Sequence, residues 1–532
     1  MAIVMRVMTR LTDYTSYADA QTQFSSARLW DLFDGDRRHL NIAHECIDRH
    51  VDADRHVGVD KTAVIVVHAD GPDEILSYRE ISEDSARFAN YLLAQGIRPG
   101  DRVAIMLEPS RAFYVTLFGT MKAGTIAVPL FTLFGPDGVA LRIEDCTPRL
   151  LITNAAKAAT LSPRAGLRVV VADAAFMASL GAFAPSFAPA TEADSLAIFQ
   201  YTSGTTRQLP EAVKHSHRAL VTVMVAALYG TGLRPGDRFI CPSSPAWGHG
   251  LWHGTLPPLA MGLTVGAYAG KFDAERLLRA LQEHRFTNMS AAATHYRMMR
   301  TCGAAARYRY AIEKLSFTGE PIDSETARFA EATFGRPVCS MYGTTEIGVI
   351  LVSYPGAADF VVKPGSLGKP VPSTKVEVHD AAGNPCPPGV TGELKVWRRN
   401  GWIATKDLGR VDEDGYFFHG GRADDVIISA GWTMSAVEIE DAILKHPDVR
   451  EAAAIGVPDA LRGQVVKAFV VAGRAGDETF VREIQDLVRQ RLSQHEYPRL
   501  VAFVAELPKT PAGKVNRKVL REHERSGAIP TA

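Results

Sequence analysis

Short apolar runs alternate with helix-like stretches in the first third of the chain. Runs rich in β-branched residues predict strands at 102–107, 125–131, 150–153 and 168–173. The stretch LSYREISEDSARFANYLLAQG has Ser77 three residues before Glu80, which is a capping box, and Gly96 as a C-terminal stop. SRAFYVTLFGTMKAG is a second helix-like stretch. This strand–helix–strand order predicts an α/β fold in which parallel-rich sheets are covered by helices.

The chain of 532 residues is too long for one compact core, so we expect at least two domains. Residues 174–195 are expected to form an irregular connection before the strand LAIFQYT. A second boundary is expected at HGGRADD, near 420–425. Beyond it the sequence predicts a compact α+β module with helices in SAVEIEDAILKH and 478–494, and strands in VREAAAIGV, VVKAFVVAG and LVAFVAEL. The predicted domains are a large N-terminal domain (1–423) and a small C-terminal domain (424–532).

Composition argues against several kinds of partner without excluding a local charged patch. Lys plus Arg and Asp plus Glu both number 59, so no overall basic field favours nucleic acid or an anionic membrane. The six cysteines show no metal-ligand spacing, which indicates reduced thiols in a cytoplasmic protein. Arg6, Arg10 and Asp13 interrupt the N-terminal apolar residues, so neither a signal peptide nor a membrane span is expected there. We therefore expect a soluble, cytoplasmic protein without membrane insertion.

Five motifs follow one another along the chain: YTSGTT (201–206), MYGTTEIG (341–348), TKDLG (405–409), GRADDVI (421–427) and PKTPAGK (508–514). A Ser/Thr/Gly loop after a strand can gather hydroxyls and backbone N–H groups around phosphate oxygens, but alone it is more often a turn. It is also not a Walker loop, because the GxxxxGK[ST] spacing is absent. Together and in this order, the five motifs resemble the adenylate-forming superfamily of acyl-CoA synthetases, luciferases and peptide-synthetase adenylation domains. Within it the chain looks most like the medium-chain and aromatic acid–CoA ligases.

The resemblance runs from LSYREI to the PAGK tail and implies an AMP-forming acid–CoA ligase. Such an enzyme makes an acyl-adenylate and pyrophosphate from an acid and ATP, with Mg²⁺, and then a CoA thioester and AMP. The N-terminal domain would bind the acid and ATP, and the C-terminal domain would be a mobile lid. Two alternatives stay open: an acyl-AMP ligase that loads a carrier protein, and a catalytically impaired binder of nucleotide or acyl-adenylate. The sequence also leaves a homodimer open.

Matching the motifs residue by residue implies the following roles. The residues matched to the ATP phosphates and Mg²⁺ are Ser203, Gly204, Thr205 and Thr206 (β- and γ-phosphates), Thr345 (α-phosphate) and Glu346 (Mg²⁺). Those matched to the rest of the nucleotide, the hinge and CoA are Glu320 and Tyr342 (adenine), Asp407 (ribose hydroxyls), Arg422 (nucleotide), Asp424 (lid hinge) and Gly431 (pantetheine tunnel). The plainer readings are that Asp407 caps a turn and that Arg422 pairs with a neighbouring aspartate.

Lys514 is the predicted adenylation residue. A carboxylate that attacks an α-phosphate brings two anions together, so the transition state needs a positive charge between them. A lysine ammonium, a compact charge on a flexible stem, suits that position. A lone lysine near a C-terminus is usually a solvated surface charge, and the PKTPAGK context overturns that reading. In relatives the lid rotates after adenylation, which would withdraw Lys514 and bring Gly431 to the site.

Two motifs depart from the family pattern. The phosphate loop reads TSGTTRQLPEAVKH, so Arg207 replaces a glycine and Glu211 stands where a lysine is usual. Arg207 or Lys214 is expected to supply the missing positive charge. In TKD, Lys406 replaces a glycine and leaves Asp407 intact.

The expected acyl pocket comprises Trp247, His249, Thr318 and Gly343. In relatives that use acetate or propionate, a tryptophan closes the pocket at the position of Gly343. Its absence predicts a medium-chain or aromatic acid rather than acetate. The alternative reading of Trp247 and Trp252 is plain core packing.

Overall fold

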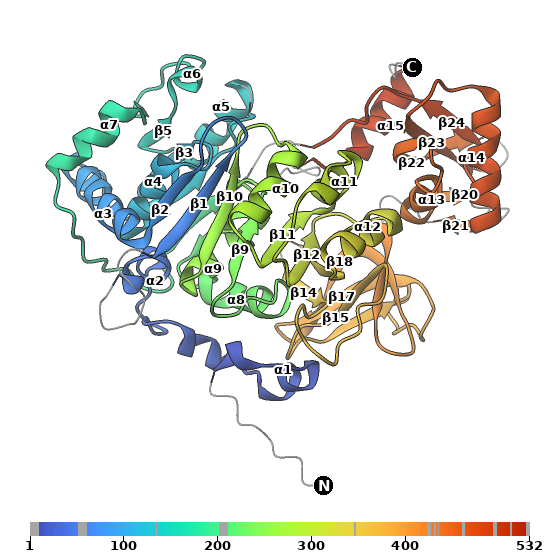
Figure 1. The fold of residues 1–532 in the computed structure, drawn as a ribbon, viewed down its shortest axis with the longest axis horizontal. Helices are drawn as coiled ribbons and strands as arrows, with labels where there is room; N and C mark the ends of the chain where they lie inside the picture. Colours follow the sequence, from blue (N-terminus) through green and yellow to red (C-terminus); the bar gives the residue numbers. More distant parts are fainter. Residues whose placement is uncertain are drawn as a thin grey trace, which may run out of the picture.

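The computed structural model describes residues 10–51, 61–134, 136–201, 211–344, 347–422, 427–429, 432–434, 436–459, 463–492, 497–510 and 513–527. It is an α/β protein with a large N-terminal domain and a small C-terminal domain that has its own sheet, as the sequence predicted (Figure 1).

The largest sheet has thirteen strands in the order β16-β17-β18-β19-β15-β14-β13-β12-β11-β9-β10-β1-β2. One part is parallel from β1 to β13, except for the edge strand β2: β1 (Thr62–His68), β2 (Glu74–Ser77), β9 (Arg238–Cys241), β10 (Thr264–Ala269), β11 (Asn288–Ala292), β12 (Lys314–Thr318) and β13 (Val338–Thr344). The other part is antiparallel: β14 (Gly348–Val352), β15 (Ser366–Pro370), β16 (Val376–His379), β17 (Gly392–Arg398), β18 (Gly401–Val411) and β19 (Phe417–Arg422). The sequence analysis did not anticipate this antiparallel extension.

A six-stranded sheet of order β6-β5-β3-β4-β7-β8 contains the four strands predicted from apolar runs. Its strands are β3 (Arg102–Met106), β4 (Ile126–Pro129), β5 (Leu150–Thr153), β6 (Arg168–Val171), β7 (Leu196–Gln200) and β8 (Val213–Ser216). Only β8 is antiparallel to its neighbour. Helices α3 (Tyr78–Ala94) and α4 (Arg111–Lys122) share one hydrophobic cluster with residues of β1 and β10 on one side and of β3 and β7 on the other. The two sheets are therefore joined through these helices.

Local signals explain where α3 begins and ends. The Ser77 side chain accepts a hydrogen bond from the backbone of Glu80, and Glu80 returns one, which confirms the predicted capping box. Gly96 takes a φ of 77°, as a glycine after a helix does. The stretch 174–195 was expected to be irregular, and that expectation is wrong for its first part. Asp173 caps α7 (Ala174–Ser179), and a short 3-10 turn follows.

The remaining helices lie around the two sheets (Figure 1). They are α1 (Tyr17–Gln23), α2 (Ile42–Cys46), α5 (Pro136–Cys146), α6 (Ala155–Ala158), α8 (Ala219–Tyr229), α9 (Leu256–Ala260), α10 (Ala274–Glu283), α11 (Ala293–Thr301) and α12 (Ser324–Phe334). Short 3-10 turns are η1 (Leu11–Asp13), η2 (Arg28–Leu32), η3 (Asp48–His50), η5 (Leu180–Ala182) and η7 (Ala305–Arg307), and η6 (His249–His253) is a π-helical turn. No helix in the described part of the chain is both long and apolar enough to cross a membrane.

The C-terminal domain stands apart from the large sheets (Figure 1, red). It comprises the hairpin β20 (Ile427–Ser429) and β21 (Trp432–Met434), the sheet β22 (Val449–Asp459), β23 (Gly463–Ala472) and β24 (Leu500–Phe503), and helices α13 (Ala436–Ile443), α14 (Glu478–Arg491) and α15 (Arg517–Ser526). Ile439, Val466 and Phe480 belong to a hydrophobic cluster confined to this domain. The two predicted helices and three predicted strands of this region are confirmed. The exact domain boundary at 423/424 stays a prediction, because residues 423–426 lie outside the described ones.

Candidate active site

One large cleft, of about 1920 Å³, is lined by both domains. The N-terminal domain contributes η6, the ends of β12 and β13, and part of β18, and the C-terminal domain contributes α13 and the segment around Lys514. Of the described residues predicted for the site, Trp247, His249, Thr318, Glu320, Tyr342, Gly343, Asp407 and Lys514 all line this cleft. The sequence therefore selected residues that are far apart in the chain and that meet in one place.

Lys514 reaches the cleft from the tail of the C-terminal domain. The Thr510 backbone N–H donates to the Lys514 carbonyl (2.7 Å), and the Lys514 N–H donates to the Thr510 hydroxyl (3.3 Å), which closes a tight turn. The ammonium nitrogen lies 5.7 Å from the centroid of the Trp247 ring. Between the two lies Gly319, at a φ of 94° that favours glycine. A Cβ there would meet Trp247 Cη2 at 3.1 Å and Lys514 Cε at 3.4 Å. The glycine thus lets the lysine stem approach the ring.

Tyr342 and Asp407 face each other at the end of the cleft that is expected to bind the nucleotide, called the nucleotide end below. The Tyr342 hydroxyl donates to the Asp407 carboxylate at 2.5 Å, and His419 Nε2 lies 3.8 Å from the other carboxylate oxygen. The Asp407 backbone N–H donates to the Thr405 hydroxyl at 3.1 Å, which orients the carboxylate's strand. Asp407 is buried. This buried carboxylate is held by a phenol.

Lys406, in the position of the motif's usual glycine, has a φ of 63°. Left-handed backbone costs a residue with a side chain about 1–2 kcal/mol. Lys406 therefore adopts the left-handed backbone conformation that a glycine would take at this position, and this strain lowers the stability of the folded chain. On the neighbouring strand, Arg422 pairs with Asp407 across β18 and β19, which places its backbone beside the same end of the cleft.

Glu320 makes its contacts within the N-terminal domain. Its carboxylate accepts the Thr294 backbone N–H at 2.7 Å and the Thr294 hydroxyl, at the start of α11. Arg297 Nη1 lies 3.5 Å away. A negative charge at a helix N-terminus is stabilising, so Glu320 serves here to cap α11. Contact with adenine stays a prediction for this residue.

His249 lies on η6, at the end of the cleft that is expected to hold the acid, called the acyl end below, and both of its ring nitrogens have partners. Its Nδ1 is 3.0 Å from the Ser243 hydroxyl, and its Nε2 is 2.8 Å from the Ser290 hydroxyl. Burial lowers the pKa of His249 well below its usual range, and the charge of Lys514 acts in the same direction. The imidazole is therefore neutral. The Trp247 ring packs edge-on against it, with centroids 5.5 Å apart.

Gly343 lines the cleft where β13 turns into β14. A Cβ at this position would lie 2.1 Å from the Gly348 carbonyl oxygen and 2.6 Å from Val349 Cα. Both are backbone atoms of the pairing strand, so nothing flexible can give way. This part of the cleft wall therefore has no room for a side chain.

The sequence analysis missed three polar residues at the acyl end, Gln200, His215 and His253, and read a fourth, Trp252, only as possible core packing. Two of them carried a signal in the sequence. Gln200 is a polar residue at the end of the otherwise apolar strand LAIFQ. His215 directly follows Lys214 on β8, so the two side chains alternate between the faces of the sheet. The same alternation corrects the expectation for Lys214. Its ammonium lies 5.4 Å from the Phe199 ring centroid, and Lys214 is not among the residues of the cleft.

Some predicted site residues lie outside the described ones. They are Ser203, Gly204, Thr205, Thr206, Arg207, Thr345, Glu346, Asp424 and Gly431, and of Arg422 only the backbone is described. Their roles stay predictions.

One ion pair and one hydrogen bond organise the C-terminal side of the cleft. Arg517 Nη2 lies 2.6 Å from Glu440 Oε2, which ties the start of α15 to α13. Asp441 Oδ1 accepts the Ser324 backbone N–H at 3.1 Å, so α13 of one domain contacts the N-terminus of α12 of the other. A few polar contacts of this kind can be exchanged when domains move.

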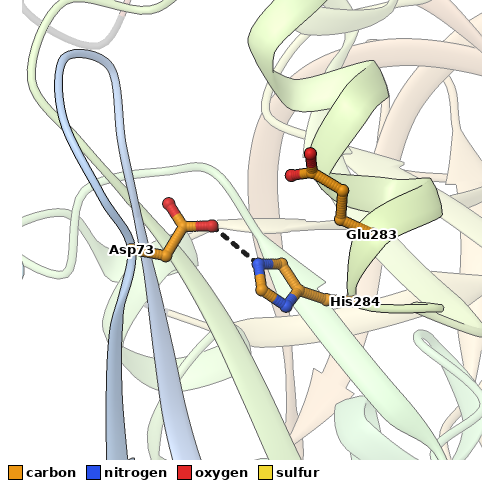
Figure 2. A group of neighbouring side chains, drawn as sticks. All are labelled: Asp73, Glu283 and His284. Carbon is orange, nitrogen blue, oxygen red and sulfur yellow. Dashed lines mark hydrogen bonds and ion pairs between the residues drawn. The ribbon is translucent and has the colours of Figure 1, made fainter.

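Another carboxylate–imidazole group, Asp73, Glu283 and His284, lies away from the cleft (Figure 2). Asp73 Oδ2 is 2.7 Å from His284 Nε2, and its other oxygen accepts from Arg276. Arg276 Nη1 also lies 3.5 Å from Glu283. A guanidinium within the group already balances both carboxylates. We therefore read it as an ion-pair network that joins the β1–β2 hairpin to α10, and not as a metal site.

Two family models match the chain, "AMP-binding enzyme" over residues 51–402 and "AMP-binding enzyme C-terminal domain" over residues 438–514. An acetyl-coenzyme A synthetase of Bacillus subtilis (strain 168) is 29% identical over 91% of this chain and 91% of its own. A 3-hydroxybenzoate–CoA ligase of Aromatoleum sp. (strain CIB) is 32% identical over 85% of this chain and 92% of its own.

Among solved structures, an acyl-CoA synthetase of Brucella canis superposes with a TM-score of 0.73 at 31% identity. The match covers 96% of this chain and 99% of that one. The motifs, the cleft between a large and a small domain, and these matches agree: the chain belongs to the AMP-binding enzyme family and is an AMP-forming acid–CoA ligase.

Proposed function

We propose that the acid activated by this enzyme is a medium-chain or aromatic carboxylic acid rather than acetate. The observation that carries this is the backbone packing at Gly343. A side chain that closed the pocket from this position would collide with β14 within 2.1 Å. The acyl end thus stays open where relatives for short acids are closed by a tryptophan. The 3-hydroxybenzoate–CoA ligase relative supports an aromatic acid, whereas the acetyl-coenzyme A synthetase relative does not.

Lys514 is proposed to act in the first half-reaction. A carboxylate oxygen attacks the α-phosphorus of ATP, and pyrophosphate leaves. The ammonium group, held by the Thr510 turn beside Gly319, offsets the charge that the two anions bring together. The thiolate of CoA then attacks the acyl carbonyl, and AMP leaves.

Nucleotide binding is proposed to exchange one hydrogen bond for others. The ribose hydroxyls donate to Asp407 and displace the Tyr342 hydroxyl, whose ring then stacks on adenine. A carboxylate can accept from both ribose hydroxyls, because it offers two oxygens. Arg422 and the loop Ser203–Thr206 are proposed to bind phosphate. Mg²⁺ is proposed to accompany ATP with Glu346 as its carboxylate ligand, since Mg²⁺ prefers oxygen ligands, and it would neutralise phosphate charge.

The two half-reactions are proposed to use two orientations of the C-terminal domain. Rotation at Asp424 would break the contact between Asp441 and Ser324 and withdraw Lys514. Gly431 would then border the CoA tunnel. We propose a cytoplasmic enzyme, and a homodimer stays open.

The test is a substrate panel with purified enzyme, ATP and Mg²⁺, using C2 to C12 and aryl acids with and without CoA. The proposed function predicts AMP and a CoA thioester in equal amounts, only when CoA is present, with little product from acetate. Pyrophosphate exchange without thioester would indicate a carrier-loading ligase. Nucleotide binding with no product from any acid would indicate an impaired binder. Acetate as the preferred acid would refute the proposed substrate class.

A further inference from the structure

The ammonium group of Lys514 has an aromatic partner in the other domain. Its Nζ atom lies 5.7 Å from the centroid of the Trp247 ring, and a ring face attracts a cation up to roughly 6 Å away. Lys514 belongs to the tail of the C-terminal domain, whereas Trp247 precedes η6 in the N-terminal domain. Both residues line the cleft. The contact therefore joins the two domains where adenylation is proposed to occur.

The Trp247 ring is held in place by its neighbours. His249 packs edge-on against it, with the ring centroids 5.5 Å apart and an angle of 79° between the ring planes. His249 is itself fixed by the Ser243 and Ser290 hydroxyls, at 3.0 and 2.8 Å from its two ring nitrogens. Burial lowers the pKa of His249 well below its usual range, so this imidazole adds no positive charge that would repel the ammonium. The ring thus offers Lys514 a supported, uncharged surface.

The backbone at Gly319 makes room for this contact. A Cβ at position 319 would lie 3.1 Å from Trp247 Cη2 and 3.4 Å from Lys514 Cε, so a side chain there would press on both partners. The φ of 94° at Gly319 is one that residues with a side chain rarely adopt. The conformation and the missing side chain both favour a close approach of the lysine stem to the ring.

A ring face suits an adenylation lysine better than a carboxylate would. A carboxylate holds an ammonium group through strong, charge-assisted hydrogen bonds. Those bonds would have to break before the lysine could bind its substrates. A tryptophan face attracts the charge through the ring quadrupole instead. It leaves the N–H groups able to donate to the acid and to the α-phosphate.

We propose that Trp247 is a positioning residue for adenylation: its ring holds the Lys514 ammonium in the cleft while the acid and ATP meet. This deepens the proposed function and rests on it, because it requires that Lys514 acts in the first half-reaction. An attraction of this size can be given up when the C-terminal domain rotates. Trp247 therefore favours the adenylation orientation without fixing it.

The experiment changes the charge distribution of the ring with little change in its shape. Mono-, di-, tri- and tetrafluorotryptophan are incorporated in turn at position 247 of the full-length chain. Each fluorine withdraws electron density from the ring face, so the rate of adenylate formation at saturating acid and ATP should fall stepwise, roughly 2- to 30-fold across the series. Thioester formation from supplied acyl-AMP should stay within about twofold of the wild type. Pyrophosphate exchange and thioester assays measure the two steps.

The matched control is the same series at Trp402. There the Lys375 ammonium lies 5.0 Å from the ring centroid, and neither residue is among those that line the cleft. Fluorination of Trp402 should leave both steps unchanged. A second measurement repeats the series at position 247 in Lys514→Ala. If the ring acts through the lysine, the fluorines should no longer change the residual rate of adenylation.

Trp247→Phe and Trp247→Leu provide further variants should a fluorinated chain fail to fold, and their adenylation rates should fall in the order Trp, Phe, Leu. An adenylation rate that does not depend on the number of fluorines would overturn the inference and leave the proposed function intact. A dependence that persists in Lys514→Ala, or an equal slowing of both steps, would do the same. If no acid in the panel gives a CoA thioester, the proposed function itself fails.

Discussion

The two ends of the cleft differ in how their polar groups are satisfied. At the nucleotide end, Tyr342 and Asp407 are bonded to each other, and Glu320 is bonded to Thr294. At the acyl end, Gln200 and Trp252 each bury a donor atom without a partner among the described residues. We expect the nucleotide end, whose polar groups are bonded to one another, to be ordered before its ligand arrives. These groups would then exchange partners when the ligand binds.

The difference follows from the elements that form each end. The nucleotide end lies where β13 meets the antiparallel extension, and its side chains meet across the cleft from β13 and β18. The acyl end lies between the six-stranded sheet and η6, where residues of β7, β8 and η6 line the same cleft. Chemistry that serves every acid is expected at the first end, and choice of acid at the second.

The largest effect is expected for Lys514→Ala. Removing the ammonium should slow adenylate formation roughly 10²- to 10³-fold for every acid, because the charge acts only while the two anions meet. Thioester formation from supplied acyl-AMP should stay within about twofold of the wild type. Pyrophosphate exchange and thioester assays measure the two steps.

Lys509→Ala is the matched control, since Lys509 lies on the same tail and is paired with Glu451 at 2.9 Å. It should leave both steps unchanged. Equal loss of both half-reactions in Lys514→Ala would contradict its assignment to the first one.

The neutral histidines of the acyl end predict a loss of stability in acid. The pKa values of His215 and His253 are lowered from 6.5 to about 4 in the folded chain, so the unfolded chain takes up these protons first. Their contribution is complete above about pH 6.5 and is lost as the pH falls toward 4. At pH 5 each should cost on the order of 1–2 kcal/mol. Thermal unfolding against pH measures this, and His215→Phe should show a shallower decline. An equal slope in that variant would mean that His215 is not buried neutral.

Asp407→Ala probes the paired end. Hydrogen bonds to a charged group contribute about 1.5–3 kcal/mol, so KM for ATP should rise roughly 10- to 100-fold. KM for the acid should hardly change, because the acyl end is separate. Asp414→Ala is the control, as Asp414 is exposed and pairs with Lys363. A larger change in the KM for the acid than in the KM for ATP would contradict the assignment of ATP and the acid to separate ends of the cleft.

A smaller effect is expected at Gly343. Because a Cβ there would meet the backbone of β14, Gly343→Trp should strain the β13–β14 hairpin by about 1–3 kcal/mol. Activity should fall for all acids together, and Gly343→Ala should show the same trend in milder form. Calorimetry and the acid panel measure both. A stable variant that gains activity with acetate would show that the hairpin yields and that Gly343 acts as a simple pocket wall.

Much of the fold was readable from local signals, and the misses have physical causes. The capping box at Ser77 predicted α3, and the β-branched runs predicted four strands of the six-stranded sheet. Both kinds of signal lie within a few residues of sequence. Asp173 starts a helix in a stretch whose composition suggested a loop, since one cap and a few alanines suffice for α7. The antiparallel extension was missed because its strands are mixed in polarity and separated by turns.

In the site, the motifs predicted residues such as Asp407 and Lys514, and the structure brings both to one cleft. They did not identify Gln200 and His215, which become neighbours only through the register of β7 with β8. Nor could they show that Lys214 lies outside the cleft, because that depends on which face of β8 the cleft adjoins. A structure was therefore needed for residues whose place in the cleft depends on strand register.

The most direct test measures one ratio in the wild type and in Lys514→Ala: the kcat/KM of adenylate formation for benzoate divided by that for acetate. We predict that the ratio favours benzoate in the wild type, and that Lys514→Ala slows both acids equally and keeps the wild-type ratio. A wild-type ratio that favours acetate, or a ratio that changes in Lys514→Ala, would contradict the separation of catalysis and selection between the two ends of the cleft.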